Sequence, residues 1–458
     1  MQKLYDEVGS LDRRCYEELF LTEDILMEHA AEGIAAFIRS KFTKGSRVCV
    51  VVGSGNNGAD GIALARLLHG DYTVTLLHAK EPKSAMAQLQ KKRADALVIS
   101  TTQEVPNDAD IIVEAIVGTG FSGTLNETLT QLIAAMNASD AYKIACDTPT
   151  PGFFAQTTLT MGALKKSLFL DARKDAVGEI KVLDLGISRK LYEAKEAAWH
   201  LLELNDIKLP HRKREDSHKG SYGHTAIIAG EKLGAAVLCA SAALRFGSGL
   251  VSLVGFENEQ TLHIPHALMY AHALPKNTTA IAVGMGLGNE FSEDELFDFL
   301  DNELPLLIDA DLFHSQTICT LLERKNILLT PHPREFVSLL RLTGLADITV
   351  EELQAKRFDY VERFCKAYPH ATLLLKGANV LIGQGDAYFV NPHGSSKLAK
   401  GGSGDVLAGL VVALLAQGYT PLEAALNGSL AHILLAKNYQ GADFSLTPDD
   451  LIEGIGNL

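Results

Sequence analysis

The sequence has no apolar stretch long enough to cross a membrane. Its longest apolar stretch, Val406 to Ala416, is much shorter than the roughly 20 residues that a membrane-spanning helix needs. The opening residues also lack the basic and then apolar layout of a signal peptide. We therefore expect a cytoplasmic protein that does not bind membranes.

Paired cysteine motifs are missing as well. The six cysteines are widely scattered, with no CxxC pair and no histidine cluster at metal-ligand spacing. In a chain of 458 residues this pattern indicates reduced thiols that serve mainly as small core residues. A disulfide-stabilised scaffold and a structural zinc site are therefore not expected.

Basic residues are too few for a nucleic-acid-binding protein. The chain has 42 Lys and Arg against 56 Asp and Glu, a formal net charge of −14, which argues against a polyanionic partner. Backbone N–H groups can still hold the phosphates of a small nucleotide in an acidic protein. With 47% apolar and 21% charged residues, the composition is that of an ordinary globular chain, and its length predicts about two to four domains.

Short apolar runs alternate with helical patterns along residues 1–205. Strands that recur between helices imply right-handed crossovers and a parallel sheet covered by helices on both faces. The first domain is thus predicted to be an α/β domain with a parallel sheet. Its predicted strands are the runs 48–52, 74–77, 97–99, 111–113, 144–146 and 180–183.

A polar, charged segment at residues 206–217 interrupts this pattern, and a second α/β pattern follows over 218–458. The basic run His211 to Arg214 is compatible with a phosphate or RNA patch, but we interpret it as a solvated linker. The runs 380–382 and 387–390 flank GQGD and predict a hairpin. Further strands are predicted at 225–229, 250–254, 280–283, 306–308, 327–329 and 372–375.

The first candidate site is a glycine turn between a strand and a helix. Gly53, Gly55 and Gly58 form a GxGxxG pattern, which lets the backbone approach a ligand and leaves helix N–H groups free for an anion. The same pattern also occurs in tight turns without a ligand. The loop is unusually polar, with Asn57 and Asp60 among its residues, which suggests a hydroxylated ligand or a monovalent cation beside it.

Two later strand ends are expected at the same edge of the sheet. One is Glu114, which precedes the glycine-rich loop from Gly118, and the other is Asp147, which precedes the turn around Pro149. Asp147 is a candidate site residue, although an Asp at such a position commonly only caps a turn.

These residues resemble the NAD(P)H-hydrate epimerase family, whose signatures LMExAG and GxGNNGGDG correspond to residues 26–31 and 53–61. The resemblance covers roughly residues 1–205. It implies a Rossmann-like fold and Asp147 as the catalytic acid/base. It also implies K⁺ bound by Asn57, Glu114 and Thr150. The implied substrate-binding residues are Asn56, Asn57, Gly58, Ala59, Asp60, Gly118, Thr119, Gly120, Phe121, Ser122, Gly123, Thr124 and Asp147.

The chain departs from this family pattern at a few positions. Ala59 replaces a glycine, Glu114 replaces an aspartate, and Thr150 and Pro151 replace the serine and glycine of the turn after Asp147. Glu114 is one methylene longer, and Thr150 keeps a hydroxyl oxygen for a cation. Because proline lacks an N–H and fixes φ, Pro151 is expected to alter the loop and weaken epimerase activity.

The second candidate site is the segment GGSGDVLAG, in which Gly401, Gly402 and Gly404 precede a long apolar helix. Consecutive N–H groups and the helix dipole make such a turn an anion site. Asp405 lies in the first turn, and a carboxylate beside a phosphate site is best used as a base for a hydroxyl that attacks a phosphoryl group. The alternative is that Asp405 only stabilises the helix. No GxxxxGK[ST] P-loop occurs in the chain.

Other polar segments follow the predicted strands of the second domain, including GMGLG, DAD, LTPHPRE and LKG. Polar groups at several parallel strand ends converge on one edge of a sheet. His332, held between prolines, is a candidate binding residue, although an isolated histidine is commonly structural. Lys376 is a candidate phosphate contact, and a solvated lysine is the alternative.

In this order the motifs resemble the ADP-dependent NAD(P)H-hydrate dehydratase family, a ribokinase-like α/β fold, across roughly residues 215–458. Only Arg334 departs from the family's PHPGE. The resemblance implies Asp405 as the catalytic base. It implies substrate contacts at Ala235, Gly288, His332, Pro333, Arg334, Glu335 and Asp405, and nucleotide contacts at Lys376, Gly377, Ala378, Asn379, Val380, Ser395, Lys400, Gly401, Gly402, Ser403 and Gly404.

The two resemblances together predict a bifunctional metabolite-repair enzyme. It would interconvert the R and S hydrates of NADH and NADPH, and dehydrate the S form with ADP to give NAD(P)H, AMP and phosphate. Expected partners are these small molecules, K⁺, Mg²⁺ and further copies of the chain. The alternatives are a ribokinase-type small-molecule kinase with a non-catalytic dinucleotide-binding N-terminal module, and a hydride-transferring dehydrogenase, which leaves the C-terminal motifs unexplained.

Overall fold

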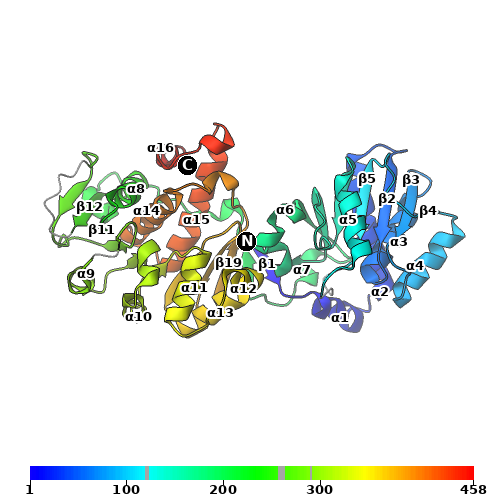
Figure 1. Cartoon of the computed structure of the whole chain (residues 1–458), viewed down its shortest axis with the longest axis horizontal. Coiled ribbons are helices and arrows are strands. Elements are labelled where there is room, and N and C mark those ends of the chain that lie inside the picture. The colour runs from blue at the N-terminus through cyan, green and yellow to red at the C-terminus, as the bar shows by residue number, and fades with distance from the viewer. Residues whose placement is uncertain (119–122, 256–263, 289–290) are drawn as a thin grey trace. The chain divides into compact units, whose positions relative to one another are not determined.

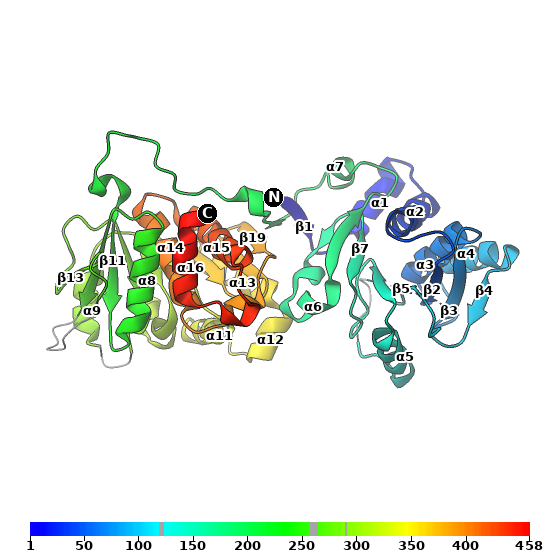
Figure 2. The same cartoon turned by 90° about the horizontal axis from the view of Figure 1, so that it is seen from above.

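The structure is a computed structural model that describes residues 1–118, 123–255, 264–288 and 291–458. By internal contacts the chain divides into two compact units (Figures 1 and 2). The N-terminal unit is Lys3–Ala197, and the C-terminal unit is Ala198–Leu458 with Met1–Gln2. The division falls before residue 205 because strand β10 (Trp199–Leu201) pairs with β19 (Ala387–Asn391) of the C-terminal unit.

The N-terminal unit is built on one parallel sheet, as predicted. A short parallel pair of β1 (Gln2–Tyr5) and β8 (Leu164–Lys165) accompanies it. The strand order in the sheet is β4 (Ser100–Thr102), β3 (Thr73–His78), β2 (Arg47–Val52), β5 (Ile111–Ala115), β6 (Tyr142–Cys146), β7 (Thr157–Met161) and β9 (Glu179–Leu183).

Helices cover both faces of this sheet. Alternate residues of β2, such as Val50, pack in one core with α2 (Glu23–Lys41) and α3 (Asn56–Leu68), while Val51 packs in another with α5 (Glu127–Ala138). A strand buried on both faces needs apolar residues at every position, which explains its continuous apolar run. The remaining helices are α1 (Gly9–Glu18), α4 (Ala85–Ala96), α6 (Lys174–Val177) and α7 (Arg189–Tyr192), with 3-10 turns at Lys166–Phe169 and Asp171–Arg173.

One predicted strand lies elsewhere. The run 97–99 was expected to be extended, whereas the edge strand β4 begins at Ser100. Helix α4 continues to Ala96, and Val98 takes a left-handed φ of 55°, which reverses the chain before the strand. Apolar composition alone does not distinguish such a helix end from a strand.

The C-terminal unit has a longer sheet that is parallel from β13 to β17 and antiparallel from β17 to β19. Strands β18 and β19 form the predicted hairpin around GQGD. The two α/β folds therefore confirm the predicted class. The strand order is β13 (Met269–Ala271), β12 (Leu250–Gly255), β11 (His224–Ala229), β14 (Ala280–Val283), β15 (Leu306–Ile308), β16 (Ile327–Leu329), β17 (Ala371–Leu375), β18 (Val380–Gln384), β19 and β10.

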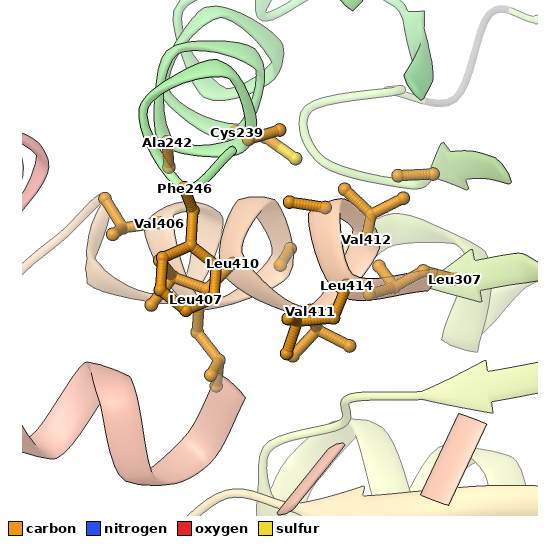
Figure 3. Packing of buried hydrophobic residues seen from close by; sticks show 14 of the residues in the cluster. Cys239, Ala242, Phe246, Leu307, Val406, Leu407, Leu410, Val411, Val412 and Leu414 are labelled. Atoms are coloured by element: carbon orange, nitrogen blue, oxygen red, sulfur yellow. The ribbon is translucent and has the colours of Figure 1, made fainter. Parts of the chain in front are cut away.

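The apolar helix α14 (Ser403–Ala416) is the centre of the C-terminal core. Figure 3 shows its Val412 and Leu414 near Leu307 of β15, with Cys239 and Ala242 of α8 (Leu233–Arg245) on another side. A Cβ on Gly409 would lie 2.3 Å from the carbonyl oxygen of Cys239, so glycine permits the close approach of the two helices. No helix in the described parts of the chain is long and apolar enough to span a membrane.

The other helices of this unit enclose the sheet. Helix α15 (Pro421–Asn438) packs on α14 and the sheet, and α13 (Arg357–Ala367) packs on β17 and β18. The rest are α9 (Glu293–Leu300), α10 (Thr317–Leu321), α11 (Pro333–Leu342), α12 (Val350–Ala355) and α16 (Pro448–Gly454), with 3-10 turns at Leu204–Asp206, Lys219–Tyr222, Ala310–His314, Ser396–Leu398, Asp443–Ser445 and Ile455–Asn457.

Candidate functional sites

The first site forms at the carboxyl ends of β2, β5 and β6. The N–H of Gly53 continues the ladder beyond the strands by donating to the carbonyl of Ala115 (2.9 Å). A Cβ on Gly53 would lie 1.8 Å from the carbonyl oxygen of Ile116. Only glycine therefore permits this turn, which starts α3 at the edge of the sheet.

A cavity of about 530 Å³ opens at this edge. Among the predicted residues, Asn56, Asn57, Asp60, Gly118 and Asp147 line it. The predicted Gly58 and Ala59 are buried and are not among its lining residues. A Cβ on Gly58 would lie 2.1 Å from the carbonyl oxygen of Gly53, and Ala59 packs against Met27. Gly123 and Thr124 are not among the lining residues. The predicted Thr119, Gly120, Phe121 and Ser122 lie outside the described residues.

Asn57 presents an unsatisfied amide at the cavity. Both its Oδ1 and Nδ2 atoms are buried and have no hydrogen-bond partner in the described structure. Leaving both polar atoms unpaired costs free energy that a bound ligand or ion can recover. A buried amide without hydrogen-bond partners is typical of a site that binds a polar ligand.

Glu114 and Thr150 are in direct contact. The Thr150 hydroxyl donates to Glu114 Oε1 at 2.6 Å, and its N–H donates to Oε2 at 2.9 Å. Burial raises the pKa of Glu114 to about 7, against the opposing effect of these hydrogen bonds. Carboxylate, hydroxyl and amide oxygens are hard ligands, so Glu114, Thr150 and Asn57 fit the chemistry of K⁺.

Asp147 is held in an unusual conformation by several donors. Its backbone is left-handed, with φ of 70°. Its Oδ1 accepts hydrogen bonds from the Thr160 hydroxyl (3.2 Å), the Met161 N–H (3.1 Å) and the ammonium of Lys165. Strained backbone of this kind persists where the surrounding structure fixes it, commonly at functional sites.

Several cavity residues were missed by the sequence analysis. They surround the predicted Asp60, whose pKa is raised by burial and by the carboxyls of Asp147 and Asp12. Asp12 accepts a hydrogen bond from the Tyr192 hydroxyl at 2.7 Å, and its pKa is also raised by burial. These residues come from α1 and α7, far from the recognised motifs, and no sequence signal connects them to the glycine turn. The missed lining residues with polar groups include Asp12, Tyr16, Glu23, Lys80, Lys165 and Tyr192.

The second site forms where β14, β15, β16 and β17 end side by side. Beyond the strands, the N–H of Asp309 donates to the Val283 carbonyl (3.0 Å), and the N–H of Lys376 donates to the Pro331 carbonyl (2.9 Å). These bonds bring the DAD, TPHP and LKG segments to one edge of the sheet, in agreement with the prediction that the polar groups at these strand ends converge.

Lys376 connects this edge to the glycine turn. Its ammonium lies 2.6 Å from Oδ1 of the buried Asp309. The same ammonium lies 3.4 Å from the position that a Cβ on Gly404 would take. A cation is therefore placed beside the N-terminus of α14, where a phosphate would bind.

The glycine turn leaves backbone N–H groups available. Gly402 caps α14 with a left-handed φ of 87°, and a Cβ on Gly401 would meet nothing within 4 Å. The N–H of Ser403 donates to the Lys400 carbonyl at 3.3 Å, whereas within the described structure those of Gly401, Gly402 and Gly404 have no backbone partner. The turn thus keeps the geometry of an anion site.

Asp405 lies in the first turn of α14, next to these groups. Burial raises its pKa to about 6, the carboxyl of Asp309 raises it further, and the ammonium of Lys376 opposes the shift. A carboxyl with this pKa is ionised at neutral pH and remains basic enough to accept a proton.

His332 is the N-cap of α11, and it faces Glu335. Its Nδ1 accepts the N–H groups of Arg334 (3.1 Å) and Glu335 (3.2 Å), and its Nε2 lies 3.1 Å from Glu335 Oε1. Burial raises the pKa of Glu335 to about 7. His332 therefore stabilises the helix start at the edge of the site, with Pro333 as the first residue of α11.

The remaining predicted residues surround this edge. Gly288 has φ of 81°, and its N–H donates to Asp311 Oδ2 at 2.9 Å. A Cβ on Gly286 would lie 3.1 Å from that of Ala235. In the nucleotide segments, Ser395 accepts the N–H of Lys397. The Lys400 ammonium donates to the Phe444 carbonyl at 2.9 Å. A Cβ on Gly394 would lie 2.1 Å from the Ala378 carbonyl oxygen. Gly377 and Asn379 lie between β17 and β18, and Val380 is the first residue of β18.

Comparisons with known proteins cover both units. The family model of NAD(P)H-hydrate dehydratase matches residues 225–457, and that of the YjeF-related protein N-terminus matches residues 23–167. The bifunctional NAD(P)H-hydrate repair enzyme Nnr of Helicobacter pylori is 41% identical, over 100% of both chains. The enzyme of that name from Escherichia coli is 30% identical over 93% of this chain and 87% of its own. A solved ADP/ATP-dependent NAD(P)H-hydrate dehydratase from Bacillus subtilis, co-crystallised with ATP/Mg²⁺, is 28% identical with a TM-score of 0.47, and covers 56% of this chain and 94% of its own.

Proposed function

The chain belongs to the family of bifunctional NAD(P)H-hydrate repair enzymes, and we propose that its two units carry out the two reactions separately. The N-terminal site interconverts the R and S hydrates of NADH and NADPH. The C-terminal site dehydrates the S hydrate with ADP, giving NAD(P)H, AMP and phosphate. The observation that carries the second assignment is a basic carboxylate, Asp405, beside free N–H groups and the ammonium of Lys376.

In the dehydration, the glycine turn and Lys376 hold the diphosphate of ADP. Asp405 accepts the proton of the hydrate hydroxyl while the hydroxyl oxygen attacks the β-phosphorus of ADP, and AMP leaves. Phosphorylation converts a poor leaving group into a good one. The electron pair of the ring nitrogen then expels phosphate, and loss of a proton from the neighbouring carbon restores the double bond.

The acidic groups at this edge fit Mg²⁺ bound together with phosphates. Among the described residues no three His, Cys, Asp or Glu side chains are arranged to hold a metal on their own. Mg²⁺ commonly keeps several waters and uses only one or two carboxylates plus substrate phosphates, and Asp309 and Asp311 are suitably placed at the strand end. When bound, Mg²⁺ neutralises charge on the transferring phosphates.

In the epimerisation, Asp147 accepts the proton of the hydrate hydroxyl as the bond between its carbon and the ring nitrogen opens to give an aldehyde. The nitrogen takes up a proton, and the reverse steps close the ring on the other face of the carbonyl. The unsatisfied amide of Asn57 and the oxygens of Glu114 and Thr150 support a K⁺ site beside the glycine turn. K⁺ there would offset the negative charge of the nucleotide phosphates and hold the ribose in place.

Six unpaired cysteine thiols support a reducing, cytoplasmic setting.

The assignment is tested with purified full-length protein and separated hydrate epimers of NADH. With ADP and Mg²⁺, the S epimer should regain the near-ultraviolet absorbance of NADH with equal release of AMP and phosphate. Without ADP, the R and S forms should equilibrate faster than in buffer. A stable phosphorylated product would indicate a ribokinase-type kinase instead, and an R form that persists at its spontaneous rate would leave the N-terminal unit a non-catalytic binding module.

A further inference from the structure

Lys165 is a buried lysine in the wall of the N-terminal cavity. Its side chain is 1% exposed, and it lies at the end of β8. Its ammonium donates to Asp147 Oδ1, to the Thr160 hydroxyl at 2.9 Å and to the Met161 carbonyl at 3.3 Å. A buried ammonium is stable only when it is paired and hydrogen-bonded, and all three partners here are fixed.

The contacts of Lys165 distinguish the two carboxylate oxygens of Asp147. Oδ1 accepts bonds from Lys165, Thr160 and the Met161 N–H. Oδ2 lies on the other side, 3.9 Å from the position that a Cβ on Gly118 would take. One oxygen is therefore held by the protein, and the other lies near Gly118, which lines the cavity.

The surroundings of Asp147 make this cation necessary. Asp12 from α1, Asp60 from α3 and the Tyr192 hydroxyl from α7 line the same cavity and interact electrostatically with Asp147. Glu23 and Lys80 complete its charged lining. Carboxyls in a buried site compete for the ionised state, so a second charge among them is disfavoured unless a cation stabilises it.

We propose that Lys165 is the positioning residue of the epimerase reaction: its ammonium supplies the counter-charge of Asp147 among neighbouring carboxyls, holds Oδ1 in place and leaves Oδ2 for the hydrate. This inference rests on the epimerase function proposed above. Lys165 acts through Asp147, which is the base, and does not itself contact the reacting carbon.

The test compares Lys165→Met with the wild type in the full-length protein. Epimerisation is followed without ADP by separating the R and S hydrates between pH 5.5 and 9.5. The variant lacks the ammonium that bonds Oδ1 of Asp147, so the acid limb of kcat/KM should move to higher pH by at least about one unit. At pH values below the limb, the kcat/KM of the variant should be roughly tenfold lower than that of the wild type, and at high pH the two values should agree. Lys165→Arg, which keeps the charge, should retain a limb closer to the wild-type position.

Two controls separate this effect from loss of folding. Lys143→Met removes another buried ammonium of the same unit, one that donates to the carbonyls of Ser139 and Ala141 outside the cavity. It should leave the pH profile unchanged. ADP-dependent dehydration of the S hydrate gives the amount of folded C-terminal unit in every sample.

Each outcome decides the proposal. A Lys165→Met profile that coincides with that of Lys143→Met overturns the inference, while wild-type protein without epimerisation overturns the proposed function itself. If Lys165→Met does not fold, Thr160→Val takes its place in the test, because it removes one hydrogen bond from Asp147 and one from Lys165. It should shift the limb in the same direction by a smaller amount, and an unshifted limb overturns the inference.

Discussion

The ammonium of Lys376 lies 2.6 Å from Oδ1 of Asp309, although 67 residues separate the two in the chain. Asp309 is 2% exposed, so the Lys376 ammonium is the counter-charge placed against a carboxyl that water hardly reaches. The pair also lies beside the glycine turn and Asp405, and its charges act on the pKa of Asp405 in opposite directions. The C-terminal site is therefore an electrostatic unit assembled from the ends of two strands and one helix.

Lys376→Met should destabilise the C-terminal unit and weaken ADP binding. Removing one partner of a buried pair leaves an uncompensated charge, with an expected cost of roughly 3 kcal/mol in the free energy of unfolding. The double variant Asp309→Asn/Lys376→Met should recover most of this stability but not the ADP affinity. Urea unfolding and calorimetric titration with ADP measure the two effects, and equal stability of the single and double variants would contradict the pairing.

Asp405→Asn should abolish dehydration while leaving ADP binding nearly unchanged. The amide keeps the size of the side chain but cannot accept the hydroxyl proton. NADH recovery from the S hydrate should fall by at least about 10²-fold, the lower end of the contribution of a general base. Epimerisation in the other unit serves as the reference for folded protein. Dehydration at the wild-type rate would remove Asp405 from the mechanism.

The dehydration should also depend on pH through Asp405. Its pKa is raised to about 6, and only the ionised form accepts a proton. The kcat/KM of the wild type should therefore be constant above about pH 7 and fall about tenfold per unit below pH 6. A rate that rises as the pH drops toward 5 would have the wrong sign for a carboxylate base.

Glu114→Gln should remove the response of the N-terminal unit to K⁺. The amide oxygen can still accept the Thr150 hydroxyl and the Ile116 N–H, but the amide NH₂ replaces the oxygen that accepts the Thr150 N–H. The variant also lacks the negative charge that attracts the cation. In the wild type, replacing Na⁺ by K⁺ should increase epimerisation and the melting temperature of this unit, and in the variant it should change neither. Glu32→Gln is a matched control, because Glu32 forms an ion pair with Arg39 at the surface. A K⁺ response that survives in Glu114→Gln would refute this ligand.

Gly53→Ala should destabilise the N-terminal unit, whereas Gly55→Ala should not. The added methyl group at Gly53 would lie 1.8 Å from a backbone oxygen, while at Gly55 it meets nothing within 4 Å. Overpacking typically costs about 1–3 kcal/mol of folding free energy. Thermal unfolding of the two variants measures the difference, and equal melting temperatures would show that the turn relaxes.

The sequence by itself determined the local elements and the residues of the two glycine turns. Continuous apolar runs such as Val48–Val52 are required by strands buried on both faces, and glycines followed by a helix mark an anion site. The segment after α4 was misplaced because the composition of residues 97–99 suits both a helix end and a strand. Asp147, Asp405 and Lys376 were identified because each directly follows a strand or begins a helix.

Only the tertiary structure decided which side chains share a site. Lys165 and Lys166 are adjacent and chemically identical in the sequence, yet Lys165 reaches Asp147, while Lys166 forms an ion pair with Asp6. Likewise, nothing local connects Asp309 with Lys376. Such pairs depend on strand register and on burial, which set the distance between charges and the strength of their interaction. Both quantities arise only when distant segments pack together.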